Sequence, residues 1–255
     1  MNSQITEFSF GFALTREIVN LNPAGFLAAP VFPSLIQEGN PGGGYDVALD
    51  FGTFLFLQFK LSEYMIRNTA GQSDVIAPPY YRFWLMPASQ SAQHAMLLDL
   101  EGSGEQVYYV APKFWTQAQF NGAFTDSQVA FESVFIPPGA IGPVTDNEDH
   151  CVVFNDVAIF ALSEPKPIQG LRGEQALERI SNSLSGAESK VRATREVAST
   201  MEGIVRRHNI SPPDLKSFHG TRQVLEYIAS LAYVFFHSEM IFIPHNSVGA
   251  GGPGN

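Results

Sequence analysis

Two polar side chains interrupt the apolar run from Thr53 to Leu61. Gln58 and Lys60 are two residues apart, so in an extended strand both side chains project to the same face. A lysine ammonium is seldom buried without a partner, because taking a charge out of water is costly. The run therefore predicts a buried strand that carries an amide and a cation side by side on one face.

A carboxylate precedes this pair at a separation that suits a β-hairpin. Asp46 lies 12 residues before Gln58, and the flanking runs predict strands at about Tyr45–Leu49 and Thr53–Leu61. Phosphodiester hydrolysis uses a hard cation that stabilises charge on the phosphate and lowers the pKa of water. Mg²⁺ (or Mn²⁺) prefers oxygen ligands, which the Asp46 carboxylate and the Gln58 carbonyl could supply. Lys60 would stand where a cation is needed beside the phosphate.

This pattern resembles the PD-(D/E)XK nuclease superfamily, with Gln-Phe-Lys at Gln58–Lys60 in place of the usual Glu-x-Lys. The order of predicted elements agrees: a first helix, the hairpin, a helix at Gln93–Gly102 and a strand at Val107–Ala111. The resemblance covers roughly residues 8–112. It implies an α/β, restriction-endonuclease-like core, in which a mixed central sheet is flanked by helices. It also implies that Asp46 and Gln58 bind the metal and that Lys60 activates water or stabilises developing charge.

Glutamine in place of glutamate removes one negative charge from the expected metal site. Glu17, on the predicted first helix, is the expected compensating ligand, because relatives in the superfamily often place an acidic residue there. Glu38, in a glycine-rich loop, is the alternative. The expected catalytic residues are Asp46, Gln58, Lys60 and Glu17, and the expected metal ligands are Asp46, Gln58 and Glu17.

The second half of the chain differs from the first in composition and in the elements it predicts. Further strands are expected up to about residue 165, and from Gly173 the sequence is charged and helical in composition. A last apolar helix is expected within Thr221–Ile243, with a stripe at Leu225, Ile228, Leu231, Ala232 and Phe235. The predicted organisation is a nuclease-like α/β domain over residues 1–170, a helical region over 171–245 and a flexible tail over 246–255. The helical region would pack on the core or serve assembly.

Composition limits the function classes. The 255 residues are 45% hydrophobic and 16% charged, which suits a globular core. The single cysteine excludes an internal disulfide and a cysteine-based zinc site. The sequence has no run of about 18 apolar residues and no secretory signal pattern, so a cytoplasmic protein without a membrane span is expected. The net charge of −10 argues against a general nucleic-acid coating protein, although a local basic groove remains open.

The sequence thus predicts a Mg²⁺-dependent nuclease, with DNA as the expected substrate and endonuclease activity as the expected mode. A role in restriction or anti-phage defence follows by analogy with the superfamily alone. The alternative is a catalytically degenerate nuclease-fold protein that acts as a binding or assembly subunit. A homodimer and a partner protein both remain open. Gln93 and His94 could face the same cleft, but a lone histidine in an apolar helix is more often structural, so His94 is not assigned to the site.

Overall fold

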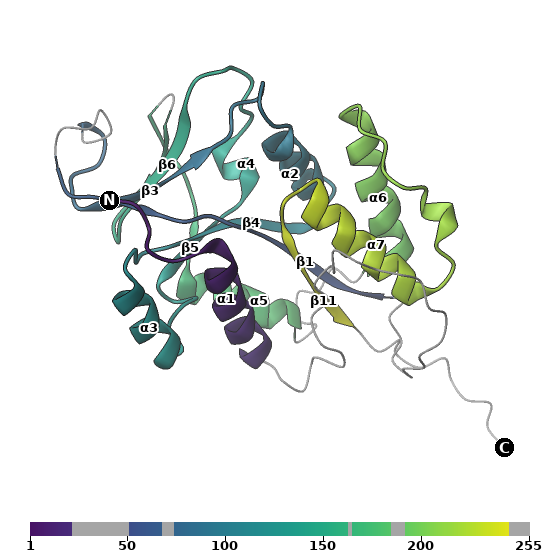
Figure 1. The fold of residues 1–255 in the computed structure, drawn as a ribbon, viewed down its shortest axis with the longest axis horizontal. Helices are drawn as coiled ribbons and strands as arrows, with labels where there is room; N and C mark the ends of the chain where they lie inside the picture. Colours follow the sequence, from purple (N-terminus) through teal and green to yellow (C-terminus); the bar gives the residue numbers. More distant parts are fainter. Residues whose placement is uncertain (22–50, 68–73, 163–164, 185–191, 245–255) are drawn as a thin grey trace.

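The computed structural model describes residues 1–21, 51–67, 74–162, 165–184 and 192–244. It is an α/β structure in which a mixed central sheet is flanked by helices, as the sequence predicts (Figure 1). The helices in these residues are α1 (Glu7–Leu21), α2 (Gln93–Gly102), α3 (Gln117–Thr125), α4 (Pro138–Ile141), α5 (Gly173–Leu184), α6 (Thr194–Arg207) and α7 (Thr221–Val234), with a short 3₁₀ turn η2 (Leu215–Ser217). In this part of the chain, no helix combines the length and apolar character needed to cross a membrane.

The central sheet is built around strand β1. Its strands are β1 (Phe51–Phe59), β4 (Gln106–Pro112), β5 (Ser133–Ile136), β9 (Leu171–Arg172), β10 (Arg192–Ala193) and β11 (Glu239–Pro244). Strand β1 is parallel to β4 and antiparallel to β11 and β10. Residues Leu55–Leu57 pair with both β4 and β11, so these two strands lie on opposite edges of β1. Strand β1 is therefore an interior strand, which explains why both of its faces are apolar.

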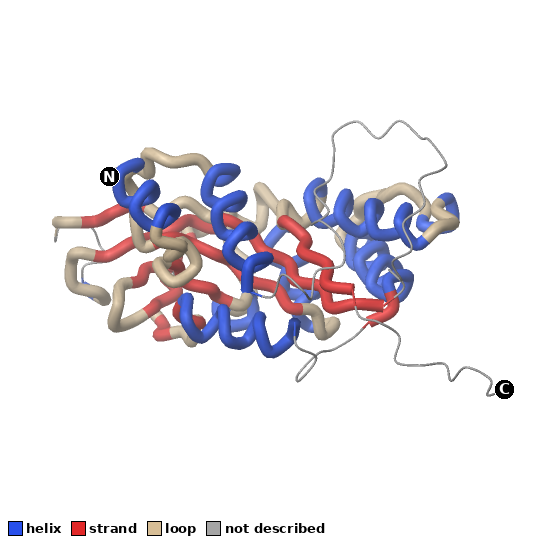
Figure 2. The backbone as a smooth tube through the Cα atoms, turned by 90° about the horizontal axis from the view of Figure 1, so that it is seen from below, coloured by secondary structure: helices blue, strands red, loops and turns tan. Residues whose placement is uncertain are grey.

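Alternation along β1 divides the core into two layers. Leu55 and Leu57 pack with α1, α3 and α5 on one face, whereas Phe54 and Phe56 pack with α2, α6 and α7 on the other. We call these the α1 face and the α2 face of the sheet. Figure 2 shows the strands as a layer with helices on both sides.

A second, antiparallel sheet joins the core on the α2 face. Its strands are β2 (Glu63–Met65), β3 (Tyr80–Leu85), β6 (His150–Phe154), β7 (Ile159–Leu162) and β8 (Lys166–Pro167), in that order across the sheet. Phe83 and Val152 of this sheet share the hydrophobic cluster that contains Phe56. The second sheet therefore covers part of the α2 face beside α2.

The described partners of β1 are β4, β10 and β11, which all come later in the chain than the predicted hairpin strand. Residues 45–50 lie outside the described residues. Within the described chain, β4 and β11 already occupy both edges of Leu55–Leu57. The described pairs therefore leave no free edge at Leu55–Leu57 for a hairpin partner, and the predicted strand at about Tyr45–Leu49 lies outside the described residues.

The C-terminal segment also differs from its prediction. Instead of one apolar helix, the chain forms α7, turns through His237 at a φ of +48°, and returns as β11. The stripe that includes Leu225, Ile228 and Leu231 is buried within its own chain. Because β9, β10 and β11 all pair in the central sheet, the region after residue 170 is part of the core as well as helical.

Candidate functional site

Gln58 and Lys60 lie near the end of β1, on the α2 face, as their spacing predicts. The Gln58 amide is hydrogen-bonded to Gln93 at the start of α2. The Lys60 ammonium lies 6.0 Å from the ring centroid of Tyr109, which pairs with Gln58 across β1 and β4. Helix α2 lies in the crossover between the parallel strands β1 and β4, after β2 and β3 and directly before β4, so its first turn lies toward the carboxyl ends of these two strands. Ligands of open α/β sheets commonly bind outside the carboxyl ends of parallel strands.

The two glutamines form a buried amide pair. Gln58 and Gln93 are 5% and 6% exposed. Gln93 Nε2 donates to Gln58 Oε1 at 2.5 Å and to the carbonyl of Phe236 at 3.1 Å. Gln58 Nε2 donates to the carbonyl of Phe59 at 3.1 Å. The pair thus joins β1, α2 and the turn between α7 and β11.

Lys60 differs from the glutamines because its charge has no hydrogen-bonded or ion-pair partner in the described part of the chain. Among the described residues, its ammonium makes no hydrogen bond and no ion pair. Burial lowers the pKa of the Lys60 ammonium from its ordinary value, and the Glu7 carboxylate acts in the opposite direction. A partly buried cation of this kind favours binding of an anion, which would restore the electrostatic interaction lost with water.

A hydrogen-bonded histidine and tyrosine belong to the same cluster. His94 Nε2 lies 2.7 Å from the Gly142 carbonyl, and Nδ1 lies 2.9 Å from the Tyr109 hydroxyl. A carbonyl only accepts, so Nε2 carries the hydrogen and the Tyr109 hydroxyl donates to Nδ1. Burial lowers the pKa of His94, and it raises the pKa of Tyr109 far above the ordinary value. The imidazole is therefore held neutral and both of its nitrogens are occupied.

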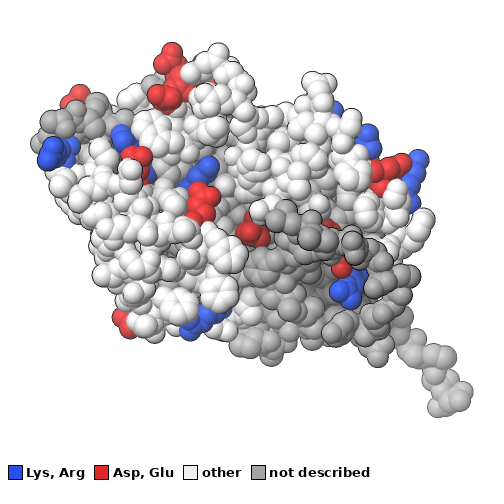
Figure 3. Space-filling model, in the orientation of Figure 1, with Lys and Arg blue, Asp and Glu red and all other residues white. Residues whose placement is uncertain are grey.

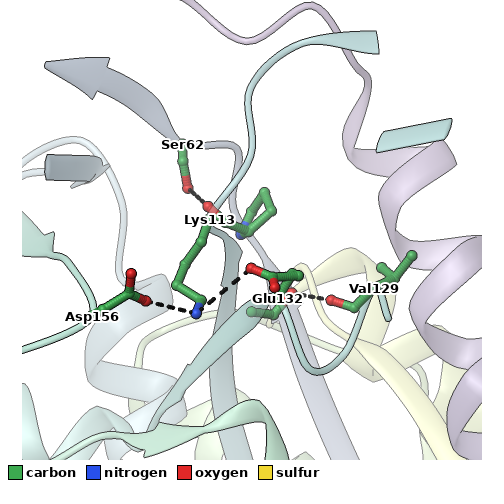
Figure 4. A network of polar contacts seen from close by, with 7 residues as sticks. Ser62, Lys113, Val129, Glu132 and Asp156 are labelled. Atoms are coloured by element: carbon green, nitrogen blue, oxygen red, sulfur yellow. Dashed lines mark hydrogen bonds and ion pairs between the residues drawn. The ribbon is translucent and has the colours of Figure 1, made fainter. Parts of the chain in front are cut away.

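Lys113, at the carboxyl end of β4, shows the opposite arrangement to Lys60. Its ammonium lies 2.9 Å from Asp156 and 3.6 Å from Glu132 (Figure 4). The Ser62 hydroxyl donates to the Pro112 carbonyl at 2.6 Å, which ties the segment after β1 to the end of β4. Lys113 is neutralised by carboxylates, so Lys60 is the better candidate for an anion site at this end of the sheet.

Glu17 lies on the α1 face and is not brought to Gln58. Its two carboxylate oxygens accept hydrogen bonds from the amides of Val129 and Ala130, at 2.9 and 2.7 Å. The predicted pairing of Glu17 with Gln58 at one metal does not agree with this geometry, because the sheet separates them. The carboxylate instead satisfies buried backbone amides between α3 and β5.

The expected metal site is only partly described. Asp46 and Glu38 lie outside the described residues. Within the described ranges, no group of three or more His, Cys, Asp or Glu side chains could hold a metal ion. Gln93 Oε1 makes no hydrogen bond in the described part of the chain, and a neutral oxygen of this kind fits Mg²⁺ or Mn²⁺. Any carboxylate ligand would have to come from the residues outside it.

The basic residues of α6 do not form a free phosphate-binding surface. Arg206 pairs with Glu202 at 2.6 Å, and Arg207 pairs with Asp99 at 3.1 Å. Arg192, just before the helix, pairs with Glu105 at 3.0 Å. Figure 3 shows scattered, and not gathered, Lys and Arg side chains on the face it presents. Binding of a polyanion would therefore depend on a few local contacts.

The sequence indicates that Gln93 could face this cleft, but not that it pairs with Gln58. A polar residue in the first turn of a helix that connects two parallel strands lies near the carboxyl end of the first strand. No protein-family model, curated protein or solved structure matches the chain. A functional assignment therefore depends on the chemistry of one cluster, formed by Gln58, Lys60, Gln93, His94 and Tyr109.

Proposed function

We propose that the protein is a metal-dependent nuclease that hydrolyses phosphodiester bonds, with DNA as the expected substrate. The observation that carries this proposal is the Lys60 ammonium, which has no ion pair among the described residues and lies beside a buried amide pair at the carboxyl end of the parallel strands β1 and β4. Endonuclease activity and a role in restriction or anti-phage defence stay predictions that rest on the resemblance to the PD-(D/E)XK superfamily, and a cytoplasmic location stays a prediction from the sequence pattern.

Each residue of the cluster has a role in this proposal. Lys60 binds the scissile phosphate and stabilises the negative charge that develops on it. The amide pair supplies a neutral oxygen. The hydrogen bond between His94 and Tyr109 holds the side chains that pack beside it. Asp46 stays the proposed carboxylate ligand. A bound Mg²⁺ or Mn²⁺ supplies charge stabilisation and a more acidic water.

Lys60→Met tests the proposal directly. Cleavage of linear and supercoiled DNA by the full chain should require Mg²⁺ or Mn²⁺ and stop with a chelator. The variant should cut at least about 100-fold more slowly, because a stabiliser of transition-state charge is lost. Lys216→Met is the matched control, since Lys216 is exposed in the turn η2. Equal rates for Lys60→Met and the parent, with both folded by circular dichroism, would refute the assignment.

Glu17→Gln provides a second comparison on the opposite face. This variant replaces a carboxylate by a side-chain amide at a place away from the cluster, where Glu17 accepts hydrogen bonds from the backbone N–H groups of Val129 and Ala130. The requirement for Mg²⁺ should stay as in the parent when rates are compared per folded molecule. A weaker response to Mg²⁺ would restore Glu17 as a ligand.

A binding subunit without catalysis is the second candidate. It is favoured by the hydrogen bond that already occupies Gln58 Oε1, the oxygen predicted to bind metal. The two candidates separate in one pair of measurements. A parent protein that binds DNA in fluorescence anisotropy, loses this binding with Lys60→Met, and cuts with neither cation is a binding subunit.

A further inference from the structure

A row of aromatic rings connects the Lys60 site with the surface of the molecule. The Lys60 ammonium lies 6.0 Å from the ring centroid of Tyr109. From Tyr109 the rings follow one another at centroid distances of 6.0, 6.3, 5.8, 5.0 and 5.8 Å, in the order Phe83, Phe154, Tyr81, Tyr64 and Trp115. The two phenylalanines are buried, whereas the last three rings of the row are half-buried. The row therefore leads out of the core.

The outer end of this row lies at the same end of the central sheet as Lys60. Tyr64 comes four residues after Lys60, so their Cα atoms are at most about 14 Å apart. Trp115 follows the end of β4, and the Ser62 hydroxyl joins the two segments at the Pro112 carbonyl (Figure 4). The carboxyl ends of β1 and β4 thus place a cation and an aromatic surface close to each other.

Trp115 ends the row, and no further ring covers it. The planes of its indole and of the Tyr64 ring are 11° apart. Among the described residues, no second aromatic ring and no cation lies against the indole. Its N–H makes no hydrogen bond in this part of the chain and is not sealed from solvent. A flat ligand with a polar edge could therefore stack on Trp115 and accept the indole hydrogen.

We infer that Trp115 and Tyr64 form a stacking site for an unpaired nucleobase, and that the nucleic acid is single-stranded beside the phosphate on Lys60. This inference rests on the proposed function and names its substrate class. Every base has a flat π face, so an aromatic ring binds single strands with little regard to sequence. In a duplex the bases are paired and stacked on each other, so a protein ring reaches them only after they leave the stack.

The charge of the molecule favours the same substrate. The net charge is −10, and the arginines Arg192, Arg206 and Arg207 are held in ion pairs, so many contacts with duplex phosphates are not supported. Stacking does not need a basic surface, and one base on an aromatic ring raises affinity about 5- to 150-fold. Lys60 with a stacked base then suffices for a short unpaired segment.

The two tryptophans of the chain provide the test and its matched control. The probe is fluorescein-labelled oligo(dT) of about 12 nucleotides, and its binding to the full chain is measured by fluorescence anisotropy with a chelator present. Trp115→Leu should weaken binding at least about fivefold, whereas Trp115→Phe should retain most of it because a ring remains. Trp84→Leu should bind as the parent does, because Trp84 is exposed and lies on the opposite face of β3 from Tyr81.

A strand without bases separates stacking from phosphate binding. An oligonucleotide of equal length made of abasic sites should bind the parent at least about fivefold more weakly than oligo(dT) does. It should bind the parent and Trp115→Leu equally. If Trp115→Leu does not fold, the Trp84→Phe chain, in which Trp115 is the remaining tryptophan, is titrated with unlabelled oligo(dT). Quenching of its fluorescence supports the stacking site, and unchanged fluorescence overturns it.

Equal affinities of the parent and Trp115→Leu for oligo(dT) overturn the inference, and so does an equal loss in Trp84→Leu. Equal binding of oligo(dT) and the abasic strand overturns it as well, because the phosphates alone would then account for binding. A duplex that binds as tightly as the single strand has the same consequence. A parent that cuts DNA and gives any of these results overturns this inference alone. A parent that neither binds oligo(dT) nor cuts DNA overturns the proposed function as well.

Discussion

Glu17 and Glu239 show how differently one structure treats the same side chain. Both carboxylate oxygens of Glu17 accept backbone amides, so its charge is stabilised in the interior. Glu239, on β11, has a buried Oε2 atom with no hydrogen-bond partner in the described chain, and burial raises its pKa. It pairs with Leu57 and so projects to the α1 face, away from the candidate site. The ionised form of Glu239 is therefore a local cost to stability.

Glu239→Gln should stabilise the protein at pH 8 and have little effect at pH 4. The folded chain holds the Glu239 proton above the ordinary pKa of 4.5, whereas the unfolded chain releases it there. The stability of the parent therefore falls as pH rises through the raised pKa, and the amide variant avoids this loss. Thermal unfolding should show a Tm higher by a few degrees at pH 8, with the gain disappearing below pH 4.5.

Glu178→Gln, at an exposed position of α5, serves as the control and should leave the Tm unchanged at both pH values. A gain from Glu239→Gln that is the same at pH 4 and pH 8 would speak against burial of the charge as its cause.

At the scale of elements, β11 decides the structure around the site. It pairs with six consecutive residues of β1, from Gly52 to Leu57. The turn that leads into it carries the Phe236 carbonyl that anchors Gln93. The segment is thus both a sheet partner and part of the site.

A chain that ends at Ser238 should fail to fold cooperatively. The truncation removes the buried side chains of Met240, Ile241 and Phe242, each of which contributes about 1.5–3 kcal/mol. Their sum is comparable with the whole stability of a typical domain, about 5–15 kcal/mol. Circular dichroism should show no sharp thermal transition, and size-exclusion chromatography should show aggregation through the open edge of β1. A chain that ends at Pro244 is the control, and similar melting of the two truncated forms would contradict the role assigned to β11.

At the scale of the whole molecule, charge argues for local contact with a substrate. The net charge is −10, and the arginines Arg192, Arg206 and Arg207 are held in ion pairs. The apolar stripe of α7 packs inside its own chain, so it does not need a second copy to cover it. Among the described residues, these arginines do not form a long basic surface for a polyanion.

Binding of DNA should therefore depend weakly on salt. With about one to three phosphate contacts, the slope of log K against log salt concentration should be about −1 to −3. Fluorescence anisotropy in the presence of a chelator measures it without cleavage. Arg206→Ala should leave the slope unchanged, because Arg206 is already paired with Glu202. A slope steeper than about −5 would mean that a broad basic surface had been overlooked.

Several local features followed from the sequence alone. The shared face of Gln58 and Lys60 follows from the two-residue period of a strand, which does not depend on neighbours. The helix that ends at Gly102 and the strand that follows it are confirmed, since both depend on local pattern and a short connection. The α/β class with a mixed central sheet, which the resemblance implies, is also confirmed.

Only the tertiary structure decided which groups surround Gln58 and Lys60. The predicted hairpin strand lies outside the described residues, whereas β11, from far along the chain, pairs with Gly52–Leu57 of β1. Glu17 was expected at the metal, but the sheet lies between it and Gln58. These relations depend on which edge and which face each element takes in the assembled sheet. Residue pattern determines which side chains share a face, whereas long-range strand pairing determines what that face meets.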